Sequence, residues 1–94
     1  MLPSHLSSTL ELLKRTFPSG LSEPEYLPLL AILYPHLADG NLATVVAEFT
    51  GKDKGIVLND VYAAGAAKNL NPYALASVRE RLIQAGFEEW LTEV

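Results

Sequence analysis

The stretch from Tyr26 to Tyr34 limits the possible folds of this chain more than any other feature, because every residue in it is aliphatic, aromatic or proline. In a helix, its leucines and isoleucine point in all directions, and a helix that is apolar all round is a buried one. The stretch is much shorter than the roughly 20 residues that a membrane-spanning helix needs. We therefore predict that it forms the central helix of a bundle, covered by the other helices.

Polar residues and prolines mark both ends of this predicted helix. The sequence Ser22-Glu23-Pro24-Glu25 is typical of a helix start, since Ser22 and Glu25 have the spacing of a capping box and proline is tolerated in the first turn. Pro35 predicts the end, because a proline cannot continue the helical hydrogen-bond pattern.

Apolar residues spaced three and four apart predict four more helices, and no run alternates as a half-buried strand would. These helices cover residues 4–17, 39–49, 59–70 and 71–85. The spacing of the last residues predicts a short sixth helix at the end of the chain. The expected fold is an all-α, compact bundle of about five helices around a buried central helix, in one domain over residues 1–94.

Several local features sharpen this expectation. Asp39 is a predicted N-cap, and Gly51 to Gly55 are expected to form a polar connection to the helix that begins near Asn59. Gly65, in an alanine-rich segment, indicates close approach of a neighbouring helix. In the last long helix we expect four residues to face the core: Leu75, Val78, Leu82 and Ile83.

Composition narrows the function classes. The chain has 94 residues, of which 49% are apolar and 19% charged, as is typical of a folded domain. It contains no cysteine, which excludes disulfides, thiolate nucleophiles and cysteine-ligated metals and suits a reducing compartment, so we expect a cytoplasmic protein. Seven Lys and Arg against eleven Asp and Glu give a net charge of −4, which disfavours a surface for phosphate backbones.

Three stretches resemble, in order and spacing, a known family of small helical proteins. They are the turn at 17–20 (FPSG), the segment 26–33 (YLPLLAIL), and the segment 78–82 (VRERL) running into Gly86 and Phe87. The family, domain of unknown function 3349, is actinobacterial and chiefly mycobacterial. The resemblance covers most of the chain but not its end, because family members usually continue the final glycine with tryptophan and proline.

This resemblance implies an all-helical fold and a bacterial cytoplasmic protein, and it brings no activity, since the family has none assigned. It also implies structural roles for the matching residues. Pro18 and Gly20 would form a turn, and Tyr26 and Pro28 would open the central helix. The core positions that it implies are Leu29, Leu30, Leu33, Val78 and Leu82.

Residues suited to catalysis are sparse. His36 and Asp39 have a spacing that a base and its partner can use, but a turn histidine beside a helix cap explains them better, because His5 is the only other histidine. Lys52 and Lys54 lie between glycines without the strand and spacing of a phosphate-binding loop. We therefore expect a protein that is not an enzyme and that needs no metal or cofactor.

The favoured functional hypothesis is a module that binds another protein or its own copy, the latter as a homodimer. Phe87, Trp90, Leu91 and Val94 share one helical face, which is either the last piece of the core or an exposed contact stripe. Trp90 is the natural anchor of such a contact, since tryptophan is enriched among the residues that dominate interfaces.

The alternative hypothesis is nucleic-acid binding by a hairpin of the two helices over 59–70 and 71–85. In such a unit Lys68, Arg79 and Arg81 would contact phosphates. The acidic net charge and the glutamate between the two arginines weigh against it. Most helical hairpins in small bundles are packing units only.

Overall fold

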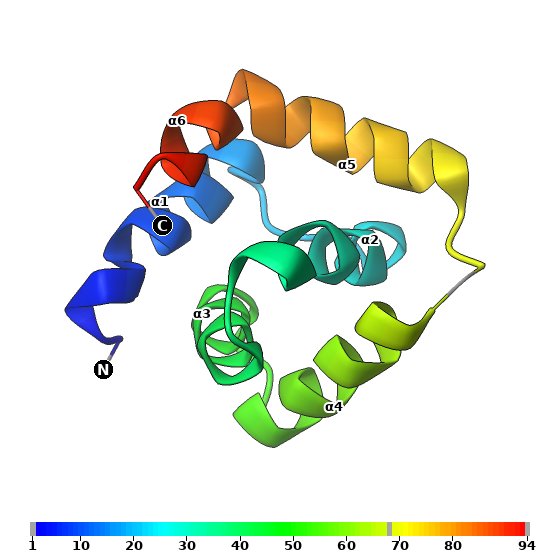
Figure 1. The fold of residues 1–94 in the computed structure, drawn as a ribbon, viewed down its shortest axis with the longest axis horizontal. Helices are drawn as coiled ribbons and strands as arrows, with labels where there is room; N and C mark the ends of the chain where they lie inside the picture. Colours follow the sequence, from blue (N-terminus) through cyan, green and yellow to red (C-terminus); the bar gives the residue numbers. More distant parts are fainter. Residues whose placement is uncertain (1, 68, 94) are drawn as a thin grey trace.

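The computed structural model describes residues 2–67 and 69–93, and these residues form an all-α bundle (Figure 1). No strand occurs among them, so the predicted fold class is confirmed. None of the helices in these ranges has the length and apolar character to cross a membrane. In chain order the elements are η1 (Ser4–Leu6), α1 (Ser7–Thr16), α2 (Glu23–Leu33), η2 (Tyr34–His36), α3 (Asp39–Thr50), α4 (Lys54–Ala66), α5 (Pro72–Gln84) and α6 (Phe87–Leu91).

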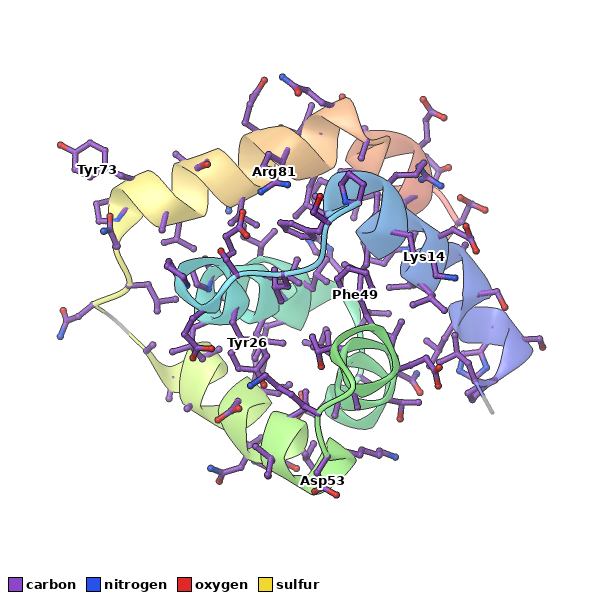
Figure 2. The ribbon with its side chains drawn as sticks, turned by 180° about the vertical axis from the view of Figure 1, so that it is seen from behind. Lys14, Tyr26, Phe49, Asp53, Tyr73 and Arg81 are labelled. Carbon is purple, nitrogen blue, oxygen red and sulfur yellow. The ribbon has the colours of Figure 1, made fainter. Side chains whose placement is uncertain are left out.

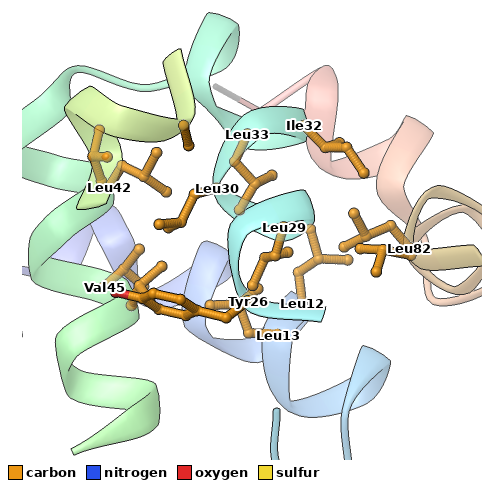
Figure 3. Packing of buried hydrophobic residues seen from close by; sticks show 14 of the residues in the cluster. Leu12, Leu13, Tyr26, Leu29, Leu30, Ile32, Leu33, Leu42, Val45 and Leu82 are labelled. Carbon is orange, nitrogen blue, oxygen red and sulfur yellow. The ribbon is translucent and has the colours of Figure 1, made fainter. Parts of the chain in front are cut away.

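Helix α2 is the predicted central helix, and it lies between α4 and α5 (Figure 1). Leu29, Leu30 and Leu33 are fully buried, and Figure 3 shows them packed among side chains of α1, α3 and α5. Their burial, with that of Val78 and Leu82 on α5, confirms the core positions that the family resemblance implied. The buried apolar area that unites the helices is therefore centred on α2.

The predicted capping box opens α2. The backbone N–H and the hydroxyl of Ser22 both donate to the Glu25 carboxylate, at 3.1 and 2.6 Å. Pro24 lies in the first turn, where its missing N–H leaves no helical hydrogen bond unmade. The helix ends at Leu33, and Pro35 lies in the 3-10 turn that follows.

Helix α3 buries Leu42, Val45 and Val46, whose spacing of three and four residues places them on one face, while Phe49 at its end is only half-buried. The predicted cap is wrong, because the N-cap residue is Ala38 and Asp39 is the first helical residue. The carboxylate of Asp39 still lies in the first turn, where the helix dipole favours negative charge.

Helix α4 begins five residues before the predicted start near Asn59. Asp53 is its N-cap and accepts a hydrogen bond from the amide of Ile56 at 3.2 Å. The prediction placed both Gly51 and Gly55 in the connection. Only Gly51, with φ of 78°, ends a helix, whereas Gly55 lies in the first turn of α4. The chain also leaves the helix at Ala66, before the predicted end at residue 70.

Gly65 marks the close approach that its sequence context predicted. The neighbour is the ring of Tyr34 in η2, and a β-carbon at Gly65 would lie 2.5 Å from that ring. Glycine at this position therefore lets η2 rest on α4, at the usual cost of glycine in a helix interior.

Helix α5 begins next to the predicted start at residue 71, and α6 is the predicted short sixth helix. The side chain of Asn71 caps α5 by accepting from the amides of Tyr73 and Ala74, and Gly86, with φ of 104°, reverses the chain into α6. Of the four residues predicted to face the core, Val78 and Leu82 are buried, Leu75 is half-buried and Ile83 is 41% exposed.

Candidate interaction surface

Two residues of the predicted contact stripe at the end of the chain, Phe87 and Trp90, lie in the core. Trp90 is 1% exposed, and its indole N–H donates to the hydroxyl of Thr9 on α1 at 2.9 Å. Phe87 stacks against Trp90 with the ring centroids 5.7 Å apart, and the His36 ring meets both of them edge-on. Of the two readings that the sequence left open, burial is the correct one for Phe87 and Trp90.

Because the side chain of Trp90 is buried, it is not exposed to anchor a partner. Leu91 is half-buried against the same core, and Val94 lies outside the described residues. The physical reason is that the short helix α6 packs on α1 and α5, so its apolar face has a partner within the fold. A contact surface has to be sought elsewhere on the bundle.

Arg81, predicted as a phosphate contact, serves the fold instead. Its guanidinium forms an ion pair with Glu25 of α2 and donates to the carbonyl oxygen of Thr16 at 3.0 Å (Figure 2). The same group lies over the Phe17 ring, 4.6 Å from its centroid. With its donors directed at α1 and α2, Arg81 joins three helices and is not directed at a ligand in solvent.

The surroundings of Glu25 favour its charged form. Burial by itself would raise the pKa of this carboxyl. The hydrogen bonds from Ser22 and the positive charge and hydrogen bond of Arg81 outweigh burial, so the pKa lies below its ordinary value of 4.5.

The predicted helix-turn-helix unit is not present in the form expected. Helices α4 and α5 both pack on α2, which separates them on either side in Figure 1. Arg79 and Arg81 are two residues apart on α5 and so point to different sides of the helix. Arg79 is exposed, and Lys68 lies outside the described residues. The structure therefore does not bring Arg79 and Arg81 together on one face of α5.

An apolar groove opens between the C-terminal half of α2, the connection from α4 to α5, and the first turns of α5. It has a volume of about 260 Å³, and the described part of its lining includes one charged side chain. We name it the α2–α5 groove, and its lining residues are Ala31, Ile32, Ala67, Leu70, Leu75 and Arg79.

A second cleft lies on the other side of Leu70, beside the N-terminal half of α2. It has a volume of about 250 Å³ and includes Leu27, Pro28 and Ala74. Pro28 is buried, whereas Leu27, which is 37% exposed, and Ala31, which is half-buried, lie four residues apart on one side of α2. Leu70 of the connection between α4 and α5 borders both clefts on this side.

A third cleft lies at the N-terminal end of α2, between the α1–α2 and α3–α4 connections. It has a volume of about 240 Å³ and includes Tyr26, Phe49 and Lys52. Its polar groups are already engaged, since the Tyr26 hydroxyl donates to Asp60 at 2.7 Å and the Lys52 ammonium lies 4.8 Å from the Tyr26 ring centroid. Burial raises the pKa of Tyr26 far above its ordinary value of 10, and the hydrogen bond to Asp60 and the nearby negative charges raise it further.

The other candidate residues stay apart from these clefts. His36 packs on the aromatic rings of α6, and Asp39 lies in the first turn of α3. Within the described ranges, no three His, Asp or Glu side chains are placed so that they could share a metal ion.

Comparison of the chain with models of known protein families, with curated proteins and with solved structures found no match.

The sequence did contain a signal for the α2–α5 groove. A helix that is apolar all round needs neighbours on every side. The sequence predicts one helix over 59–70, whereas α4 ends at Ala66, and Ala67 and Leu70 of the following connection line the groove. Leu75, predicted as a core residue, lies at the edge of the same groove.

Proposed function

We propose that the protein is a non-enzymatic module that binds another protein, and that the α2–α5 groove is its contact surface. One observation carries the proposal: an apolar side of the central helix stays partly exposed, and apolar residues from α5 and the preceding connection extend it into a groove. Contiguous exposed apolar surface on a small soluble domain is typical of interaction sites.

The size and chemistry of the groove favour a protein partner over a small molecule. Its volume of about 260 Å³ is below the roughly 300–1,000 Å³ of most small-molecule sites. Its lining has one charged group, which gives little to orient a polar metabolite. Aliphatic side chains of a partner would be removed from water in such a groove, and that burial stabilises a complex.

A capture experiment tests this proposal. Tagged protein would be used to capture partners from a native lysate, half of it treated with nuclease, and the bound protein and nucleic acid would be analysed in each half. We expect a protein partner that survives nuclease and moderate salt, because apolar association depends little on ionic strength. Light scattering over a range of concentrations would show whether the partner is a second copy.

Matched variants locate the contact. Leu75→Ser removes an aliphatic group from the groove, and Ile83→Ser makes a comparable change elsewhere on α5. Leu70→Ser provides a second groove variant outside a helix. We expect the two groove variants to lose the partner and Ile83→Ser to retain it, with folding checked by circular dichroism. Capture that is the same for all three would refute the groove as the contact surface.

Nucleic-acid binding is the second candidate. Of its two candidate residues that the structure describes, Arg79 is exposed on α5 and Arg81 is engaged within the fold. Nucleic acid in the untreated half of the lysate, with protein lost after nuclease, would reverse the order of the two proposals.

We also propose a cytoplasmic location and kinship with the domain of unknown function 3349 family. The absence of cysteine supports the location. The kinship is supported by the turn at 17–20, where Gly20 has φ of 91° and so needs glycine, and by the burial of Tyr26 and Pro28 at the start of α2.

A further inference from the structure

We infer that the partner segment in the α2–α5 groove is an amphipathic helix that presents a carboxylate to Arg79. This inference rests on the proposed function and deepens it, because it specifies the chemistry of the partner. Two features support it: Arg79 makes no ion pair or side-chain hydrogen bond within the described residues, and it borders an apolar groove.

Arg79 differs from the other two arginines of the chain. Arg15 donates to the carbonyl oxygen of Ala85 at 2.9 Å, and Arg81 pairs with Glu25 and Thr16. Within the described residues, Arg79 has neither an ion pair nor a side-chain hydrogen bond. Among the described residues that line the groove, Arg79 is also the one charged side chain.

An arginine placed this way selects for a carboxylate. The guanidinium binds a carboxylate through two parallel N–H···O bonds, and arginine is enriched among the residues that dominate interfaces. Beside the aliphatic lining, a bound partner would exclude water from Arg79, which strengthens the pair relative to one on an open surface. The chain as a whole carries a net charge of −4, so Arg79 also fixes where an acidic group of the partner can lie.

The groove favours a helix as the partner element. It runs between two helices and has an apolar lining, which is the geometry in which an amphipathic helix lays its apolar side chains into a surface. Strand addition would need an exposed sheet edge, and the described residues contain no strand. A nucleic-acid backbone would need several cations along its path, and among the residues that the structure describes in this lining one is a cation.

Selection from random peptides displayed on phage tests the inference on the full-length protein. Wild-type protein would be the target, and Leu75→Ser would be used to remove peptides that bind elsewhere. We expect the enriched sequences to have apolar residues at offsets of three and four, with Asp or Glu beside them. Binding of the synthesised peptides would then be measured by fluorescence anisotropy.

A charge swap gives the decisive measurement. We expect Arg79→Glu to weaken binding of an acidic peptide by about tenfold or more, and the peptide with Lys in place of its acidic residue to recover the loss. Lys54→Glu, an equivalent charge change at an exposed position on α4, should leave binding unchanged.

The outcomes separate the inference from the proposed function. Peptides that depend on Leu75 but are indifferent to Arg79→Glu would overturn the acidic partner and leave the groove as a contact surface. A selection that enriches no peptide would overturn the groove as well. Binding of a fluorescent DNA duplex at low salt that Arg79→Glu abolishes would assign Arg79 to phosphate and overturn the inference.

Discussion

At the scale of single residues, the ion pair of Arg81 with Glu25 shows how one side chain can hold separate helices together. Arg81 extends from α5 to the end of α1 and the start of α2, where Glu25 already accepts two hydrogen bonds from Ser22. The pair is partly exposed, which limits the free energy that it contributes. Its importance lies in connecting three elements at one point.

The lowered pKa of Glu25 predicts how stability depends on pH. Folding favours the carboxylate, so its contribution is fully present above the unfolded pKa near 4.5 and is lost as the pH falls through the lower folded pKa. We expect Glu25→Gln to reduce the free energy of unfolding at pH 7 by about 1 kcal/mol or less. The difference in the free energy of unfolding between the wild-type protein and Glu25→Gln should become smaller as the pH falls.

Urea unfolding followed by circular dichroism between about pH 7 and pH 3 would measure this difference. Glu23→Gln is the matched control, since Glu23 lies in the same first turn without the contact to Arg81. A Glu25→Gln effect that is independent of pH would show that the charge of Glu25 is not what the fold uses.

At the scale of elements, the boundaries of the helices depend on which polar side chain reaches a free amide. The sequence predicts Asp39 as a cap and places Asp53 in a connection, but it is Asp53 that accepts a hydrogen bond from the helix that it precedes. Asp39 lies one position too far into α3 for this role. The first turn of α4 therefore depends on a specific bond, and that of α3 does not.

We expect Asp53→Ala to lower the free energy of unfolding by about 0.5–2 kcal/mol, because the amide of Ile56 loses its acceptor. Asp39→Ala should cost less, since only the interaction with the helix dipole is lost. Chemical denaturation of both variants, with amide hydrogen exchange at Ile56, would test the comparison. Equal losses would mean that α4 starts where the sequence first suggested.

At the scale of the whole molecule, the two ends of the chain are part of one core. Trp90 and Thr9 are 81 positions apart in the sequence and share a buried hydrogen bond, and Arg15 joins Ala85 in the same region. Helix α6 thus completes the bundle by covering α1. We therefore expect both ends of the chain to unfold together with the core.

We expect Trp90→Ala to lower the free energy of unfolding by about 3–5 kcal/mol, because it leaves a large cavity. Trp90→Phe should lose less, since it keeps much of the buried area while leaving the hydroxyl of Thr9 without the indole donor. Thermal unfolding by circular dichroism would rank them, with the exposed Thr92→Ala as control. A stable Trp90→Ala protein that has lost its partner would restore Trp90 as the contact residue.

The sequence by itself determined the helical class, the central place of α2 and the two best-formed helix starts. These features depend on local chemistry, since the capping residues at Ser22 and Asn71 and the apolar residues of 26–34 act through neighbours close in the chain. The burial of Leu42, Val45 and Val46 followed from the same periodicity.

Only the tertiary structure decided which apolar faces are covered. Trp90 and Leu75 both belong to apolar faces with the spacing of core residues. Trp90 is buried because α6 packs on α1, whereas Leu75 borders an open groove. The same holds for charge, because Arg79 and Arg81 are near neighbours in sequence and only Arg81 meets a carboxylate. Contacts between residues far apart in the chain set these outcomes, and periodicity within one helix carries no information about them.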